Sequence, residues 1–579
     1  MRRVKPMASN VLTDAKKATK EWLNRHRYKL VGILGLLLIT LILVQWIDSG
    51  EPDVVGGPLM VRRLTEEQYR ATIADVFSPD IAVNGRFEAP ARTQGLVSVG
   101  TSTSGMSPFA VEQYDIAAQG IASAVLSPTH RKKFLPCLIK DPKAFDAKCA
   151  RAFLTEKGRL LFRRPLQRAE ADKYVALAQA TTAQLGDYPK GLELGLYAML
   201  ISPEFLFRIE RIEPVNPGDK AELDAYSKAS RLSFFLTNAA PDNELLEAAA
   251  NGDLDSRWGL STQVDRLMAS PRYTSAVRDF FADMMHFDEF PTLSKDPAIY
   301  PAYNSDLAVD AQEQTLRTIT HHLLEDEGDY RDLFTTRDTF LTRNLGIVYQ
   351  TPVATRSGWE PARFSKDSHR QGIQSHVSFL ALHSHPGRSS PTLRGYAVRQ
   401  IFLCQEVPDP PSNVDFTAVE RGAHAKKSTA RDRLSMHNSE PSCAGCHKVM
   451  DPPGLTMERY DGLGRFRTTE NGAIINASGS LDGMDFDDSE GLADALRKHP
   501  EAPRCVAERL YKSAVGRDIV WRERYYLDWL NEAFAEDGYR IPALMRRIAL
   551  SDNFFAITPP KPAPFTQIVQ NSAKKEPEL

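Results

Sequence analysis

The chain has 579 residues, which is too long for one ordinary domain and predicts roughly three or four domains. Its formal net charge is −2 and its basic residues are scattered among acidic ones, so a nucleic acid is not an expected partner. Six cysteines are too few for a disulfide-dense scaffold.

The first predicted element is a transmembrane helix at residues 30–47, an apolar run of 18 residues without charge. At about 1.5 Å per residue, this run just crosses a bilayer core. A cleaved signal peptide is the alternative, but no small-x-small cleavage site follows Ile47. Nine basic and two acidic residues precede the helix, and such a segment stays cytoplasmic. We therefore expect a single-pass protein of the bacterial inner membrane, anchored in the lipid bilayer, with its main body in the periplasm.

The exported part is predicted to be mainly α, a multi-helix body that follows a linker at residues 48–59. Thr65 can cap a first helix that buries Tyr69, Ile73 and Phe77. Beyond this helix, apolar side chains recur at helical spacing and strand signals are weak. Helices are expected at 109–126, 166–185, 188–209, 223–236, 242–249, 261–268, 275–285, 305–325, 489–498, 502–515, 522–536 and 541–550, with a short hairpin within 471–483.

Changes in composition divide the chain into segments. Residues 1–29 form the cytoplasmic basic segment, and residues 557–579 are a Pro/Lys-rich tail predicted to be disordered. Between the linker and the tail, the predicted domains are an N-terminal helical domain at 60–130, a helical domain at 131–212, a central helical domain at 213–350, a domain richer in Pro, Ser, His and Arg at 351–485, and a C-terminal helical domain at 486–556.

A C-x-x-C-H motif at Cys443, Cys446 and His447 is the one segment that indicates a cofactor. Two thiols at this spacing add to the vinyl groups of a haem, and the histidine that follows ligates the iron from one face. A thioredoxin-like pair would need a βαβ pattern, and a zinc site would need a second ligand pair. Neither is found in the sequence. We therefore predict one covalent haem c, held by the cytochrome c-like domain at 351–485, with His447 as proximal ligand.

The distal iron ligand is left open by the sequence. Met450 lies three residues after His447, on the same side of a helix, and is not expected to reach the opposite haem face. The remaining candidates are Met457, Met484, His383 and His385, each with a packed or surface role as the alternative. A vacant or water-bound position is also open.

Other polar residues near the motif have two interpretations each. Four arginines are candidates for pairing with haem propionates, with structural salt bridges as the alternative: Arg388, Arg394, Arg465 and Arg467. Asp451, next to a proline, is expected to stop the motif helix. His321 and His322, followed by Glu325, give no complete metal triad and are interpreted as exposed polar residues of a helix.

The four cysteines outside the motif are predicted to form two disulfides in an oxidising compartment. Cys137 and Cys149 flank a short segment, and Cys404 and Cys505 remain as the second pair. Buried free thiols are the alternative.

Seven segments, one of which contains the C-x-x-C-H motif, resemble a known family. They are RRLTEEQY at 62–69, LFRRPL at 161–166, SPEFLFRIE at 202–210, ASRLSFFL with PDNELL within 229–246, HPGRSSPTLRG at 385–395, CAGCHKVMDPPG at 443–454 and LYKSAVGR at 510–517. In these segments the chain resembles the planctomycete and proteobacterial cytochrome-like proteins built from consecutive domains of unknown function. The resemblance implies a helical exported protein with a C-terminal haem c module and no established substrate. Family members often have other residues at Met457 and His385, so the resemblance supports neither as a ligand.

Three functions are compatible with these features. The first is one-electron transfer between a periplasmic oxidoreductase and the respiratory chain, with a redox partner protein in the periplasm or inner membrane. The second is a haem-dependent oxidoreductase whose helical body binds a substrate. The third is a scaffold that the haem stabilises. The anchor and the single haem favour electron transfer, and no nucleophile-base-acid set indicates a hydrolase or transferase.

Overall fold

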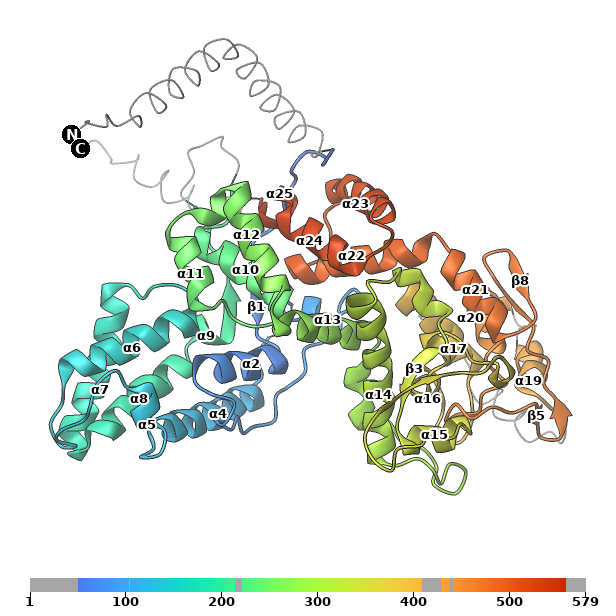
Figure 1. Cartoon of the computed structure of the whole chain (residues 1–579), viewed down its shortest axis with the longest axis horizontal. Coiled ribbons are helices and arrows are strands. Elements are labelled where there is room, and N and C mark those ends of the chain that lie inside the picture. Colours follow the sequence, from blue (N-terminus) through green and yellow to red (C-terminus); the bar gives the residue numbers. More distant parts are fainter. Residues whose placement is uncertain (1–49, 104, 214–220, 409–427, 438–440, 559–579) are drawn as a thin grey trace, which may run out of the picture. The chain divides into compact units, whose positions relative to one another are not determined.

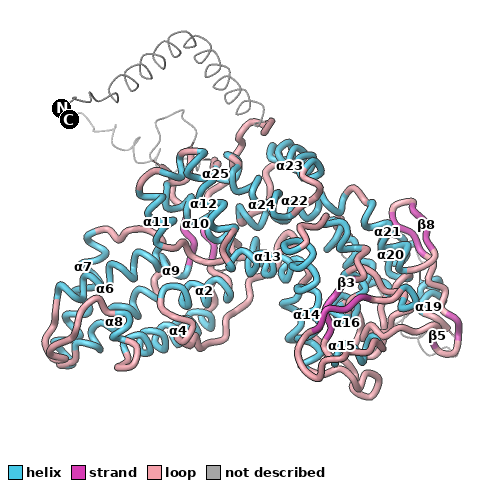
Figure 2. The backbone as a smooth tube through the Cα atoms, in the orientation of Figure 1, coloured by secondary structure: helices cyan, strands magenta, loops and turns pink. Residues whose placement is uncertain are grey.

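The computed structural model describes residues 50–558, apart from residues 104, 214–220, 409–427 and 438–440. Its described part is mainly α-helical, as predicted, with four small two-stranded antiparallel sheets (Figures 1 and 2). No helix in this described part is long and apolar enough to span a bilayer. The predicted anchor at 30–47 and residues 559–579 of the predicted tail lie outside it.

The N-terminal half of the body begins with a short sheet. Strand β1 (Val61–Arg63) pairs antiparallel with β2 (Phe207–Ile209). Helix α2 (Glu66–Val76) then starts at Thr65, as predicted, because the Thr65 hydroxyl accepts from the Gln68 N–H while the Gln68 side chain accepts from the Thr65 N–H. A first hydrophobic core is enclosed by α2, α4 (Pro108–Leu126), α6 (Ala147–Phe162), α7 (Arg168–Leu185) and α8 (Tyr188–Leu200).

The predicted helix at 188–209 is wrong in its last third. Helix α8 ends at Leu200, and the Ser202 hydroxyl caps a new turn, α9 (Pro203–Leu206), before the chain extends into β2. The reason is Pro203, which has no N–H to continue a helix and favours an extended residue before it. The chain can therefore turn back and pair with β1.

A second core is built from Leu96 and Val99 together with buried residues between Ala221 and Ile557. Its main helices are α10 (Ala225–Thr237), α12 (Arg257–Met268), α13 (Pro271–Met284), α14 (Ser305–Thr320), α16 (Val377–Leu382), α17 (Pro391–Ala397), α22 (Glu501–Val515), α23 (Arg524–Glu536) and α24 (Ile541–Leu550). Helix α20 (Pro441–Leu455) packs on α17 at the side of this core. Within this core the Phe402 ring contacts the Phe334 ring and the Phe379 ring, with centroid distances of 5.2 and 5.3 Å respectively. The residues on both sides of the motif helix, such as Leu403 and Met457, therefore belong to one core.

Shorter elements complete the described part. They are α3 (Val97–Gly100), α5 (Arg131–Phe134), α11 (Asn243–Ala250), α15 (Arg343–Tyr349), α19 (Ala430–His437), α21 (Ser489–Lys498), α25 (Asp552–Phe555), the pair β3 (Asp338–Leu341) and β4 (Glu360–Arg363), the pair β5 (Thr469–Glu470) and β6 (Ala473–Ile474), and the pair β7 (Gly479–Leu481) and β8 (Met484–Phe486). Two tight hairpins thus replace the single predicted one. A π-helical turn, His321–Glu325, continues α14 to the end of the predicted helix.

A buried ionic cluster joins β1, β2 and α10. The Glu210 carboxylate accepts from Arg62 Nη2 at 3.1 Å and from Arg231 Nε and Nη2 at 2.9 and 2.7 Å. Their side chains are at most 5% exposed. Burial raises the pKa of Glu210, but the charges of Arg231 and Arg62 outweigh it and lower the pKa to about 2. Glu210 is therefore a carboxylate at neutral pH.

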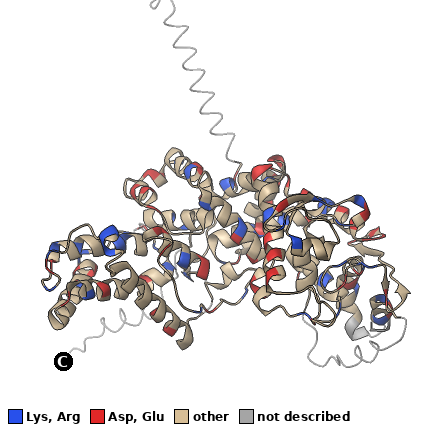
Figure 3. Cartoon of the chain, turned by 60° about the horizontal axis from the view of Figure 1, so that its bottom comes forward, with Lys and Arg blue, Asp and Glu red and all other residues tan. Residues whose placement is uncertain are grey.

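Charged residues of both signs are mixed over the exposed helices. Figure 3 shows Lys and Arg interleaved with Asp and Glu in that view. Many of them form ion pairs across or along helices, such as Arg151 with Asp172 and Lys190 with Glu193. Exposed pairs of this kind contribute about 0–1 kcal/mol each, so the two cores carry more of the stability.

Candidate functional site

The C-x-x-C-H motif lies on helix α20, with Cys443, Cys446 and His447 in its first two turns. The expectation that Asp451 stops this helix is wrong, since α20 continues through Pro452 and Pro453 to Leu455. Proline cannot donate the helical hydrogen bond. The Val449 carbonyl, four residues before Pro453, instead accepts from Arg399 Nε at 3.2 Å. A tertiary contact therefore replaces part of the hydrogen bonding that the prolines remove.

Helix α20 packs closely against α17, and two glycines make the approach possible (Figure 1). A Cβ atom at Gly395 would overlap the Met450 carbonyl, and a Cβ atom at Gly454 would overlap the Pro391 carbonyl. The backbones of α17 and α20 are in direct contact where the two helices cross. The motif helix is therefore held by close backbone contact with α17, which restricts where His447 can lie.

Replacing Gly395 with alanine is therefore expected to lower the free energy of unfolding by about 1–3 kcal/mol, because an added methyl group must push two backbones apart. Chemical denaturation of the full chain measures the change. Gly120→Ala in α4 is the control, since only Asn84 Nδ2 lies within 4 Å of a Cβ there, at 3.9 Å. Alanine at that helical position should stabilise by up to about 1 kcal/mol. Equal effects of the two substitutions would contradict the close packing.

The imidazole of His447 is oriented by a carboxylate one helical turn away. Its Nδ1 donates to Asp451, at 2.9 Å from Oδ2 and 3.1 Å from Oδ1. Asp451 is 1% exposed and also accepts from the Thr392 hydroxyl of α17 at 2.8 Å. Nδ1 carries the proton because a carboxylate only accepts, so Nε2 is left with a lone pair for a metal. Sequence reasoning assigned Asp451 to the end of the helix and missed its contact with His447, although the i, i+4 spacing of the two residues was the available signal.

The cysteines divide into two groups as predicted. Cys137 pairs with Cys149 and Cys404 with Cys505, with Cα atoms 5.9 and 5.2 Å apart. Both disulfides use only cysteines outside the motif. Cys446 is a half-buried free thiol whose Sγ lies 3.8 Å from the Pro408 carbonyl oxygen. It is therefore accessible for thioether formation, as the fit of a covalent haem requires.

Three of the distal candidates, His383, Met457 and His385, lie in different surroundings. His383 packs on the Phe379 ring at 4.7 Å, and its Nε2 is buried without a hydrogen-bond partner among the described residues. Burial and the charge of His286 lower its pKa to about 3, so the ring is neutral. Met457 is 1% exposed in the second core, and His385 is exposed. The distal ligand stays a prediction.

Two of the four candidate propionate partners are committed to protein groups. Arg394, fully buried, donates to the Met457, Tyr460 and Leu380 carbonyls at 2.8, 2.7 and 3.2 Å. Arg467 donates to Glu458, which lies 3.8 Å from Arg394. Arg394 and Arg467 therefore have a structural role, which was the alternative to pairing with haem propionates.

The two adjacent histidines lie in the π-helical turn. His321 is 43% exposed and contacts Asp326, whereas His322 donates from Nε2 to the Asp329 carbonyl at 2.8 Å. In the described ranges, no group of three or more His, Cys, Asp or Glu side chains has the geometry to hold a metal ion. These histidines therefore act as helix polar groups.

Comparison with known proteins identifies five consecutive family models, each described as a protein of unknown function. In chain order they match residues 62–127 (DUF1587), 149–210 (DUF1595), 223–351 (DUF1592), 370–470 (DUF1588) and 482–554 (DUF1585). No curated protein and no solved structure matches the chain. The C-x-x-C-H motif falls within the DUF1588 match. The chain is therefore built from a series of consecutive cytochrome-like domains of unknown function.

Proposed function

We propose that this protein is a c-type cytochrome with one covalent haem, anchored in the bacterial inner membrane, that transfers single electrons in the periplasm. The observation that carries the proposal is the hydrogen bond from His447 Nδ1 to the buried Asp451 carboxylate. This bond selects the tautomer and ring orientation that a proximal iron ligand needs. It lies in a C-x-x-C-H sequence on one helix, which is the order that haem c attachment requires.

The residues that would hold the group are Cys443 and Cys446 through thioethers and His447 through Nε2. When bound, haem c supplies reversible one-electron chemistry at iron. The chain supplies orientation through Asp451 and rigidity through the close contact of α17 with α20. A fixed ligand geometry favours electron transfer because little has to move when the charge changes.

The anchor is part of the same proposal. It rests on the uncharged run at 30–47, on the basic segment before it, and on two disulfides that suit an oxidising compartment. A redox partner in the periplasm or the inner membrane then lies within reach of a tethered haem.

An optical redox titration of the full chain, produced with the haem-attachment machinery, tests the proposed function. We expect a low-spin spectrum and one transition that follows a one-electron Nernst curve. Carbon monoxide and cyanide should leave the spectrum unchanged. An immediate shift on adding either ligand would mean an open iron position and would favour the enzyme over the electron carrier.

Asp451→Asn is expected to raise the midpoint potential, because an amide accepts a weaker hydrogen bond from His447 and the imidazole then donates less charge to the metal. The expected rise is on the order of 60 mV, the one-electron equivalent of about 1.4 kcal/mol. The control is Asp485→Asn, an exposed aspartate on β8, which should leave the potential nearly unchanged. A potential that Asp451→Asn does not move would contradict the role of Asp451.

A further inference from the structure

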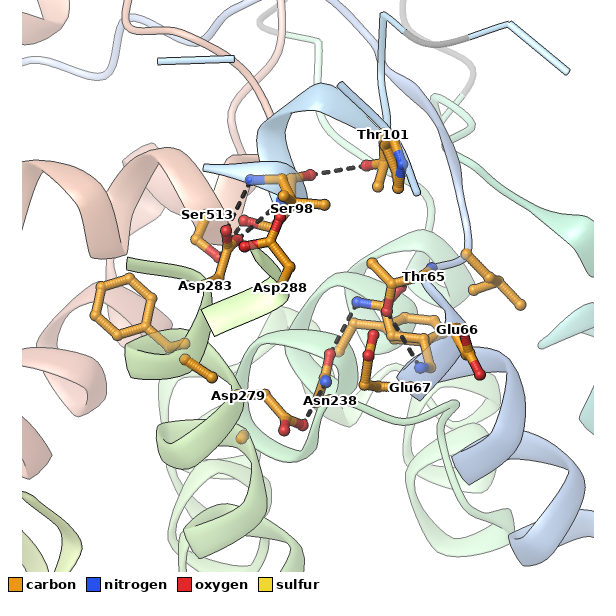
Figure 4. Close-up of a pocket in the computed structure, with 18 of the residues that line it drawn as sticks. Thr65, Glu66, Glu67, Ser98, Thr101, Asn238, Asp279, Asp283, Asp288 and Ser513 are labelled. Atoms are coloured by element: carbon orange, nitrogen blue, oxygen red, sulfur yellow. Dashed lines mark hydrogen bonds between the residues drawn. The ribbon is translucent and has the colours of Figure 1, made fainter. Parts of the chain in front are cut away.

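A cavity of about 440 Å³ lies between the two hydrophobic cores, away from the motif helix (Figure 4). Its walls come mainly from α2, α10, α13 and α22 and from the loop between α2 and α4, while β2 contributes Arg208 and α4 contributes Tyr114. Six aromatic side chains line it: Phe87, Tyr114, Phe234, Phe235, Phe280 and Phe287. The volume lies within the range of about 300–1,000 Å³ that is usual for small-molecule sites.

Most carboxylates of this cavity are already neutralised by arginines. Glu66 pairs with Arg70 at 2.8 Å, Glu88 with Arg63 at 3.7 Å, and Asp283 with Arg92 at 2.9 Å, while Asp288 also pairs with Arg92. These pairs hold the walls together. Because these four carboxylates are already paired with arginines, they offer little net negative charge to a ligand.

Asp279 differs, because the Asn238 amide is its only polar partner among the described residues. Asn238 Nδ2 donates to Asp279 Oδ2 at 2.7 Å, and Asn238 is itself held by Gln68 Nε2 at 2.9 Å (Figure 4). Within the described ranges, no Lys, Arg or His lies within ion-pair distance of Asp279 or of its neighbour in the cavity, Glu67. A positioned carboxylate without a cation therefore lines the cavity.

Arg208 also lines this cavity, and it is a cation without an ion-pair partner among the described residues. It is 7% exposed, and its guanidinium lies over the Phe234 ring at 4.2 Å from the centroid. Among the described residues its guanidinium makes neither a hydrogen bond nor an ion pair, and its Nε is buried without a partner. The nearby Glu210 carboxylate is occupied by Arg62 and Arg231. A buried guanidinium without an acceptor is costly unless an anion reaches it.

We propose that this cavity binds a small zwitterion with an aromatic body, such as an aromatic amino acid. The ligand carboxylate would pair with Arg208, its ammonium group with Asp279, and its ring with the aromatic walls. A guanidinium matches a carboxylate in bidentate fashion. An anion alone would leave Asp279 unpaired, and a cation alone would leave Arg208 unpaired, whereas a zwitterion satisfies both.

Three probes with the same aromatic body separate the contributions: L-phenylalanine carries both charges, 3-phenylpropionate only the carboxylate, and 2-phenylethylamine only the ammonium group. Isothermal titration calorimetry on the full chain with haem measures each affinity. We expect L-phenylalanine to bind at least roughly tenfold more tightly than either single-charge probe, because it alone forms both ion pairs.

Two substitutions locate the binding. Arg208→Gln should remove the advantage of L-phenylalanine over 2-phenylethylamine and leave the amine bound as before. Asp279→Asn should remove the advantage of L-phenylalanine over 3-phenylpropionate and leave 3-phenylpropionate bound as before. The unaffected probe in each case shows that the variant is folded. No binding of L-phenylalanine, affinity equal to that of the single-charge probes, or indifference to both substitutions would overturn the proposal.

The cavity does not depend on the haem, so its test can be separated from that of the proposed function. The same titration on the Cys443→Ala/Cys446→Ala double variant should give the same affinities. Binding that persists in this variant supports the cavity even if the redox titration fails. Binding that requires the motif cysteines would overturn the assignment to Arg208 and Asp279.

Discussion

The Cys443→Ala/Cys446→Ala double variant is expected to contain no covalently attached haem. Each thioether needs one of these two sulfur atoms, and a histidine ligand alone does not survive denaturation. Haem staining after denaturing electrophoresis, together with the absorbance of the purified full chain, measures the result. We expect complete loss of the stain and a protein that remains folded, since backbone contacts at Gly395 and Gly454 pack α20 on α17.

The matched control is the Cys137→Ala/Cys149→Ala double variant, which also removes two cysteines of the exported body. These two form a disulfide in the first core, on a different part of the chain from the motif. This variant should keep its full haem stain. Staining that survives without Cys443 and Cys446, or a wild-type chain that never stains, would show that the motif does not attach haem.

Glu210→Gln is expected to cause the largest loss of stability, about 3–5 kcal/mol, because it leaves Arg62 and Arg231 as buried like charges without a counter-ion. Chemical denaturation of the full chain measures the change in the free energy of unfolding. Asp172→Asn is the control. Its partner Arg151 and Asp172 itself are each 49% exposed, so breaking this pair should cost about 0–1 kcal/mol.

The same carboxylate predicts how stability depends on pH. The pKa of Glu210 falls from 4.5 to about 2 on folding, a difference worth about 3 kcal/mol. A lowered pKa in the folded state gives a contribution that is complete above pH 4.5 and is lost as the pH falls from there towards 2. Glu210→Gln should therefore flatten the acid side of the stability profile. An unchanged acid limb would contradict the ionised cluster.

Local signals predicted much of the helical body. Thr65 caps α2 as expected, and the closing helices α21 to α24 lie close to their predicted ranges. Prediction failed where a long-range contact decided the outcome. Strand β2 is extended because it pairs with β1, and this partner lies about 150 residues earlier in the sequence. Propensity within a short window contains no information about such a partner.

The C-x-x-C-H motif that indicates a haem is determined by the sequence alone, because thioether spacing and the adjacent histidine are properties of neighbouring residues. The two disulfides could likewise be assigned by elimination among six cysteines. Only the tertiary structure decided that Asp451 orients His447 and is itself held by Thr392 of α17. Only the tertiary structure decided, too, that α20 continues through two prolines, because Arg399 donates to a carbonyl that the prolines leave without a donor. It also decided that Arg394 belongs to the core and that Arg208 and Asp279 line one cavity. Such assignments depend on groups far apart in the chain, whose pairing is set by packing and burial.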